Sequence, residues 1–313
     1  MTFTRLSVII VSWNVRELLR RALDTAAASW GARPGLELIV VDNASRDGSP
    51  EMVRADFPHV RLIANAANVG FTRGNNQGLE AATGDYLLLL NPDTEILGDA
   101  LPQMVDYMAA HPDVGMLGPQ LLNPDGSVQS SRRRFPTLPV LFLESTWLEG
   151  MAPRRWLRRF YVEDRPDNAT QPVDWITGAA MLTRRETVTQ VGGMDEGFFM
   201  YSEEVDWCRR IRAAGWDVVY YPAARIVHHE GKSSEQVAPA RHIYFQSSKI
   251  RYTRKYHGAL AAESLRLWLL AQYLWQMALE SGKWLLGHRR PLRAERVAAY
   301  RQVLRSGLKS PQG

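Results

Sequence analysis

The first part of the chain alternates short apolar runs with segments of helical periodicity. Four apolar runs have the length expected of strands buried on both faces: 6–13, 36–45, 60–65 and 85–93. Three intervening segments carry helix formers: 15–30, 49–57 and 72–83. Strands that alternate with helices predict an α/β fold with a mainly parallel sheet flanked by helices.

The pattern changes after residue 113. Residues 114–139 contain Gly-Pro and Pro-Asp-Gly turn signals and predict a hairpin. Residues 203–214 predict a helix that Gly215 closes, and a strand with a polar loop is expected over 217–234. These elements extend the first part of the fold without a regular strand–helix alternation.

The C-terminal part, residues 241–313, is basic and aromatic at first and then helical. Residues 264–290 form an apolar, Trp-rich segment in which Gln272, Gln276 and Glu280 follow at a spacing of four. Such a helix either packs on protein, including a second copy of the chain, or lies in a membrane interface. The second interpretation gives 241–290 a peripheral membrane contact, with nearby Arg and Lys facing anionic headgroups.

Composition narrows the class of protein only moderately. The chain has 313 residues, a formal net charge of +5 and a pI of about 9.4, which suits an anionic partner. Cys208 is the only cysteine, so no intrachain disulfide can form and a reducing compartment is expected. No stretch has the roughly 18 uncharged apolar residues of a transmembrane helix, and the run 6–11 is too short for a signal peptide.

Polar residues follow three of the predicted strands. In doubly wound sheets, ligands bind beyond the carboxyl ends of the strands. The first strand is followed by Ser12 and Asn14, the second by Asp42 and Asn43, and the fourth by Asn91 and Asp93. Three strand ends therefore point to one binding edge.

Asp93 is the candidate metal ligand. It follows a buried leucine run, and Pro92 keeps Asn91 extended, so the carboxylate is held firmly at the sheet edge. A carboxylate there can ligate a divalent cation that neutralises phosphate, although an isolated Asn-Pro-Asp is more often a simple turn. His228, in the segment 228–234, adds an imidazole that favours Mn²⁺ over Mg²⁺. His229 is the alternative histidine, and Lys232 could meet phosphate.

Three acids stand near the start of the helix predicted at 203–214. Acids at a helix start are favoured by its dipole, which explains Glu203, Glu204 and Asp206 without a function. Adjacent glutamates also point about 100° apart on a helix, so that one can hold a substrate while the other accepts a proton. Motifs of rival enzyme classes are missing, namely the dinucleotide-binding and P-loop glycines, the nucleophile elbow and paired zinc cysteines.

Seven segments occur in an order that resembles the inverting family 2 glycosyltransferases, and within them the bacterial rhamnosyltransferase-like branch. These segments are SVIIVSWN, VVDNASRDGS, NVGFTRGNNQG, LLLLNPDTEI, WITGAAMLTRRE, GGMDEGFFMYSEEVDWCRR and ARIVHHEGKSS, within about residues 5–255. The resemblance implies a GT-A fold. It also implies a catalytic domain over 1–240, with a nucleotide-sugar half at 1–115 and an acceptor half at 116–240.

The resemblance also implies a role for each matching residue. Asp93 and His228 would bind Mn²⁺ or Mg²⁺, and Glu204 would be the catalytic base, with Glu203 as its alternative and Asp206 in the same segment. Asn91 replaces the first acid of the family's Asp-x-Asp motif. The expected nucleotide- and sugar-binding residues are Ser12, Asn14, Asp42, Asn68, Gly70, Phe71, Asn75, Asn91, Trp175, Gly178 and Lys232.

The function that the resemblance implies is transfer of a sugar to a glycan or polyprenyl-linked acceptor in cell-surface polysaccharide synthesis, with L-rhamnose from dTDP-rhamnose as the expected donor sugar. The enzyme would work in the cytoplasm, on the inner face of the membrane. Three alternatives stay open. They are transfer of another UDP- or GDP-sugar, a nucleotidyltransferase, and a non-catalytic module that binds carbohydrate or nucleic acid. Nucleic acid is the less expected partner.

Overall fold

The computed structural model describes residues 5–144, 146–229 and 238–309. Contacts divide the chain into two compact units. The first comprises residues 1–135, 158–196 and 203–233, and the second comprises residues 136–157, 197–202 and 234–313. Each unit is therefore assembled from separate pieces of the chain. The domain boundary expected near residue 240 remains a prediction.

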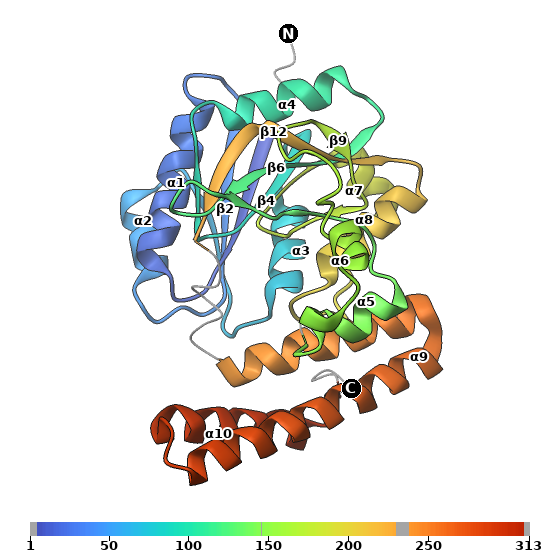
Figure 1. The fold of residues 1–313 in the computed structure, drawn as a ribbon. Coiled ribbons are helices and arrows are strands. Elements are labelled where there is room, and N and C mark those ends of the chain that lie inside the picture. The colour runs from blue at the N-terminus through green and yellow to red at the C-terminus, as the bar shows by residue number, and fades with distance from the viewer. Residues whose placement is uncertain (1–4, 145, 230–237, 310–313) are drawn as a thin grey trace. The chain divides into compact units, whose positions relative to one another are not determined.

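A ten-stranded sheet forms the centre of the first unit (Figure 1). Its main path runs β3-β2-β1-β4-β11-β6-β12-β5. The four strands expected from the sequence are parallel neighbours: β1 (Leu6–Ser12), β2 (Leu36–Asp42), β3 (Arg61–Ala64) and β4 (Tyr86–Leu90). The other half is mixed: β5 (Thr94–Ile96), β6 (Val114–Leu122), β11 (Ala180–Arg184) and β12 (Asp217–His228).

Helices cover both faces of this sheet. The helices of the unit are α1 (Arg16–Trp30), α2 (Ser49–Asp56), α3 (Phe71–Ala81), α4 (Ala100–Ala110), α7 (Arg185–Val191) and α8 (Glu203–Ala213). One core joins α1, α2 and α4 to side chains such as Val8 and Leu88. On the opposite face α3 packs so closely that a Cβ on Gly78 would lie 2.2 Å from Cγ2 of Ile9. The fold is thus the predicted layered α/β arrangement.

Short strands complete the part of the first unit that follows β6 in the sequence. The predicted hairpin is present as β6 and β7 (Val128–Gln129). Further on, β8 (Arg132–Arg133) pairs with β10 (Trp175–Ile176), and β9 (Gln171–Pro172) pairs with β12. The helix α6 (Arg154–Phe160) spans the boundary between the two units in sequence.

The second unit is helical, as its sequence predicts. It contains α5 (Leu138–Leu143), the 3-10 turn η1 (Glu149–Met151), α9 (Ala238–Leu285) and α10 (Arg290–Ser306). Gly258, with φ of 88°, introduces a kink that divides α9 into two helical segments. The polar row on α9 faces inward, because Gln272 and Glu280 are buried and Glu280 accepts a hydrogen bond from Arg293 of α10. Within the described residues, no helix is long and apolar enough to cross a bilayer.

Candidate functional site

Two buried side chains with unused polar atoms lie side by side at the end of the parallel strands. Ser12 and Asp42 are paired in the register of β1 and β2. One carboxylate oxygen of Asp42 accepts a hydrogen bond from the amide of Ser45. The other oxygen, Oδ1, and the Ser12 hydroxyl have no hydrogen-bond partner among the described residues. Since buried polar groups are normally paired, these atoms are available for the polar edge of a ligand.

The adjoining loops are tied to this edge by side-chain bonds. Asn14 adopts a left-handed φ of 53°, its amide donates to Ser45 Oγ, and its Oδ1 accepts from the amide of Arg46. On the other side, Asn43 donates to the carbonyl of Gly70. The loops after β1, after β2 and before α3 are therefore held together.

The turn before α3 is also internally braced. Asn68 Oδ1 accepts from the amide of Gly70, whose φ of 90° favours glycine. Asn75 is buried on α3 and donates to the carbonyl of Phe71. The sequence predicts this loop beside the nucleotide and the sugar. The amide side chains of Asn68 and Asn75 stabilise it through hydrogen bonds to its own backbone.

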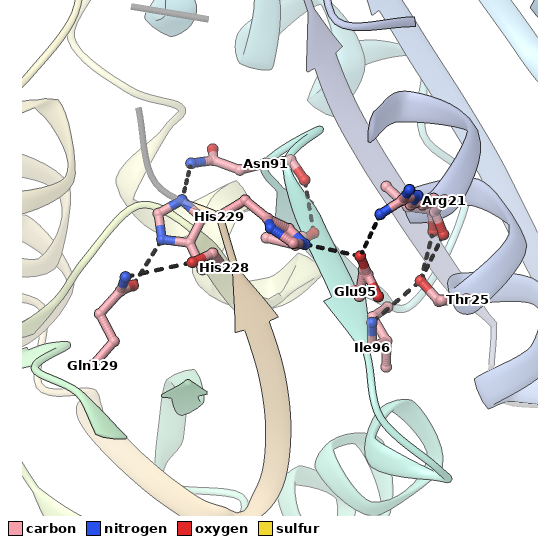
Figure 2. Close-up of polar contacts among 10 residues, drawn as sticks. Arg21, Thr25, Asn91, Glu95, Ile96, Gln129, His228 and His229 are labelled. Atoms are coloured by element: carbon pink, nitrogen blue, oxygen red, sulfur yellow. Dashed lines mark hydrogen bonds and ion pairs between the residues drawn. The ribbon is translucent and has the colours of Figure 1, made fainter. Parts of the chain in front are cut away.

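Asp93 and His228 meet at the end of β4. Figure 2 shows this histidine between Asn91 and Gln129. Asp93 Oδ1 lies 3.4 Å from His228 Nε2, and both side chains are buried. Asn91 Nδ2 is also 3.4 Å from this nitrogen, whereas Asn91 Oδ1 has no hydrogen-bond partner among the described residues. The pairing of β12 with β5 places His228 opposite Thr94 and thereby fixes this geometry.

Gln129 orients the histidine, and nothing in the sequence pattern marked it. Its Oε1 lies 2.7 Å from His228 Nδ1, while its Nε2 donates to Asn123. The imidazole therefore donates from Nδ1, which leaves the lone pair of Nε2 directed at Asp93 and Asn91. An outer partner of this kind is typical of histidines that ligate metals.

His229, the alternative histidine, belongs to a different group of side chains. Its Nε2 bonds Glu95 Oε1 at 2.8 Å, and Arg21 of α1 lies 3.4 Å from the same oxygen (Figure 2). The hydrogen bond from His229 lowers the pKa of Glu95. Glu95 thus holds the imidazole of His229, whose backbone amide donates to the carbonyl of Asp93, which gives this acid the structural role that the sequence did not reveal.

Glu204 lies beside the segment that precedes β11. A Cβ on Gly178 would lie 3.9 Å from Cβ of Glu204 and 3.9 Å from Cε1 of Phe71. The same segment is joined to the end of β4, since the amide of Asn91 donates to the carbonyl of Ala179. These contacts place Glu204 and Phe71 beside Gly178, and the next residue, Ala179, joins this segment to Asn91 within the first unit.

The two glutamates differ in environment. Glu203 is buried, and its Oε2 has no hydrogen-bond partner among the described residues. Burial, with repulsion from Glu204, raises the pKa of Glu203 well above its ordinary value. Glu204 is only partly buried. Of the two, Glu204 is the more exposed and is therefore better placed to reach a substrate.

Other candidate residues serve packing in this structure. Asp206 is fully buried and pairs with Arg210, whose other nitrogens donate to the carbonyls of Val191 and Gly193. Trp175 is buried on β10 and donates to the carbonyl of Arg134. Lys232 lies outside the described residues.

The Asp93–His228 pair fits a divalent cation that completes its coordination with substrate oxygens. A cation of this kind commonly takes one or two protein carboxylates together with phosphate and water. No cluster of three His, Cys, Asp or Glu side chains is present in the described ranges, so protein alone would not enclose the ion. The unpaired Oδ1 of Asn91 supplies one further oxygen near the pair.

A sheet edge with orphan polar groups after β1 and β2, a carboxylate after β4 and a glutamate beside residue 178 fits a glycosyltransferase of the GT-A type. The sequence comparison is specific at the level of the family. Residues 7–207 match the model of glycosyl transferase family 2, and the chain belongs to this family.

Curated relatives point to the same branch. The chain is 32% identical over 249 residues to an N-acetylglucosaminyl-diphospho-decaprenol L-rhamnosyltransferase of Mycobacterium tuberculosis, covering 76% of this chain and 80% of the relative. It is 25% identical to the rhamnosyltransferase WbbL of Escherichia coli, over 58% of this chain and 69% of that protein. These matches support the rhamnosyltransferase-like resemblance seen in the sequence.

Solved structures confirm the fold. The mannosyltransferase PcManGT of Pyrobaculum calidifontis, solved with GDP-Man and Mn²⁺, superposes with a TM-score of 0.54 at 18% identity, over 97% of this chain and 88% of that chain. GalNAc-T7, solved with UDP, GalNAc and Mn²⁺, gives a TM-score of 0.57 at 15% identity, over 80% of this chain and 48% of that chain. The GT-A fold with a helical C-terminal region is therefore established.

Proposed function

We propose that the chain transfers a sugar, L-rhamnose from dTDP-rhamnose, to a lipid-linked acceptor with inversion of configuration. The observation that carries this proposal is the link from Asn91, through the carbonyl of Ala179, to Gly178 beside Glu204. It joins the Asp93–His228 pair and a candidate base at one edge of one unit. The mycobacterial relative supports the choice of sugar and acceptor class.

The proposed chemistry is a single displacement. Glu204 takes the proton from an acceptor hydroxyl, whose oxygen forms a bond to the anomeric carbon of the donor. The bond from that carbon to the diphosphate breaks on the opposite face, so the configuration inverts. A divalent cation held by Asp93 and His228 would supply positive charge for the departing diphosphate. Asp42 and Ser12 would hold the nucleotide through their unpaired oxygens.

The test of this function is a donor screen. With Mn²⁺ and a panel of nucleotide sugars, release of nucleoside diphosphate should be fastest with dTDP-rhamnose and should disappear when EDTA removes the metal. Preference for a UDP- or GDP-sugar would keep the enzyme class and replace the donor. Failure to bind any nucleoside diphosphate by calorimetry would count against the proposal as a whole.

We further propose that the chain works at a membrane surface through α9. On the exposed side of α9, the segment 267–282 presents only uncharged side chains, among them Leu267, Leu274 and Trp275, which are more than half exposed. Exposed cations, including Lys283 and Arg290, follow directly. An apolar stripe bordered by cations complements an anionic bilayer, whereas two copies facing each other would bring like charges together.

Vesicle sedimentation tests the membrane contact. The chain should bind vesicles that contain anionic phospholipid more strongly than neutral ones, and Leu274→Glu should abolish this difference because it places a charge in the apolar stripe. Met151→Glu is the matched control, since Met151 is also exposed but lies on η1. If Leu274→Glu instead dissociates a dimer and leaves vesicle binding intact, the stripe is a protein interface.

A further inference from the structure

A basic cavity lies in the first unit, separate from the groups at the ends of β1, β2 and β4. It has a volume of about 160 Å³ and is lined by Arg134, Val162, Arg165, Pro172, Val173, Asp174 and Arg212. One water needs only roughly 15 Å³. The cavity is thus large enough for a small polar group, and three guanidinium groups surround it.

Backbone contacts hold these arginines in place. Arg165 Nη1 donates to the carbonyl of Pro172 at 3.2 Å, and Arg212 Nη1 donates to that of Val173 at 2.8 Å. Arg134 makes two parallel bonds of 2.9 Å to Asp164. A fixed guanidinium loses little conformational freedom when it binds an anion. The cavity is therefore preorganised for a planar or tetrahedral oxyanion.

Positive charge prevails around the cavity. Asp174 lines it 3.8 Å from Arg212, and one of its oxygens is already taken by the amide of Phe135. Arg209 lies over the ring of Phe135, and Arg133 lies over that of Trp175. Three arginines therefore line the cavity, Arg134, Arg165 and Arg212, whereas Asp174 is the acid among its lining residues and Asp164 pairs with Arg134.

The cavity is connected to the proposed catalytic base through α8 and β10. Arg212 follows Glu204 by eight residues on the same helix, about 12 Å along its axis. Asp174 directly precedes Trp175 on β10. The donor diphosphate is instead expected at Asp93, which follows β4, and His228, which ends β12. A basic cavity that lies apart from this pair, on the helix that carries the proposed base, points to the other substrate.

We propose that the cavity lined by Arg134, Arg165 and Arg212 binds the diphosphate group of the acceptor. This inference rests on the proposed transfer to a lipid-linked acceptor and adds the residues that recognise its head. Guanidinium groups bind phosphate oxygens through paired, charge-assisted hydrogen bonds, which neutral sugar hydroxyls cannot match. By holding the diphosphate attached to the acceptor sugar, the cavity would position the hydroxyl of that sugar.

Calorimetry in metal-free buffer tests the cavity with three probes: inorganic phosphate, pyrophosphate and farnesyl diphosphate. The wild-type chain should bind both diphosphates, and Arg165→Gln should weaken this binding about tenfold, as expected for loss of one charge-assisted contact. Arg212→Gln provides a second variant if the first does not fold. Arg158→Gln is the matched control, because Arg158 is exposed on α6 and does not line the cavity.

The outcomes separate the cavity from the proposed function. Diphosphate binding that weakens in Arg165→Gln or Arg212→Gln but not in Arg158→Gln supports the proposal. Absence of diphosphate binding, equal weakening in the control, or binding of inorganic phosphate alone would overturn it. Binding of dTDP with Mn²⁺, measured on the same wild-type preparation, reports on the donor site. Its failure would reject the transferase function independently of the cavity.

Discussion

A Glu204→Gln variant is expected to lose glycosyl transfer while it still binds the donor nucleotide. Glutamine preserves the size of the side chain and its place beside Gly178, but it cannot accept the proton of the acceptor hydroxyl. Removal of a general base typically costs about 10²- to 10⁴-fold in rate. Turnover under saturating donor, compared with the dissociation constant of dTDP in the presence of Mn²⁺, measures the two effects separately.

Glu203→Gln is the matched comparison, because it makes the same exchange one residue earlier. The raised pKa of Glu203 keeps its carboxyl protonated to higher pH, so glutamine resembles the form already present. The larger loss of turnover is therefore expected for Glu204→Gln. The reverse order would move the base to Glu203, and full turnover of both variants would exclude a glutamate base.

The Glu203→Gln exchange should also change how the free energy of unfolding depends on pH. Because the pKa of Glu203 is raised in the folded state, the unfolded chain releases this proton first as the pH rises. The stability that the wild type draws from protonated Glu203 is present at low pH. It is lost between the unfolded pKa and the higher folded pKa. Glu203→Gln should reduce this decline, which denaturant unfolding at several pH values would reveal.

The parallel half of the sheet was predictable because its signals are local. The leucines of 87–90 are buried on both faces of β4, and an uninterrupted apolar run is sufficient to indicate such a strand. Ser12 and Asp42 could be assigned to one edge for the same reason, since parallel neighbours end together. The family resemblance added residue roles that strand patterns alone leave open.

What the sequence could not predict depends on contacts between distant segments. Gln129 meets His228 across 99 residues, and Glu95 meets His229 across 134, so no periodicity could indicate either pair. The C-terminal extension was expected to be helical, but the contact between α9 and α10 was not, and Arg293 of α10 explains why Glu280 can be buried within an apolar helix. The basic cavity likewise combines residues from 134–174 with Arg212, so only the folded chain reveals it.

An Asp93→Asn variant is expected to lose metal-supported transfer. The exchange keeps the shape of the side chain at the end of β4 but removes the negative charge that faces His228. Loss of an outer partner of a metal ligand typically costs about 10- to 100-fold in metal affinity. Loss of the carboxylate itself should cost at least as much. Titration of Mn²⁺ into the chain with bound dTDP, followed by calorimetry, measures this affinity directly.

Two further variants, compared with Asp93→Asn, test whether Asp93 and His228 bind the metal. Gln129→Leu removes the acceptor that holds His228 Nδ1 and should weaken Mn²⁺ binding less than Asp93→Asn does, because both ligands remain. Asp99→Asn makes the same change of charge in the exposed turn before α4 and should leave Mn²⁺ affinity unaltered. If Asp93→Asn and Asp99→Asn bind Mn²⁺ equally well, Asp93 is a turn residue that merely ends a buried strand. If only Asp93→Asn and Gln129→Leu lose affinity, in that order, the leucine run of β4 serves to immobilise a metal ligand.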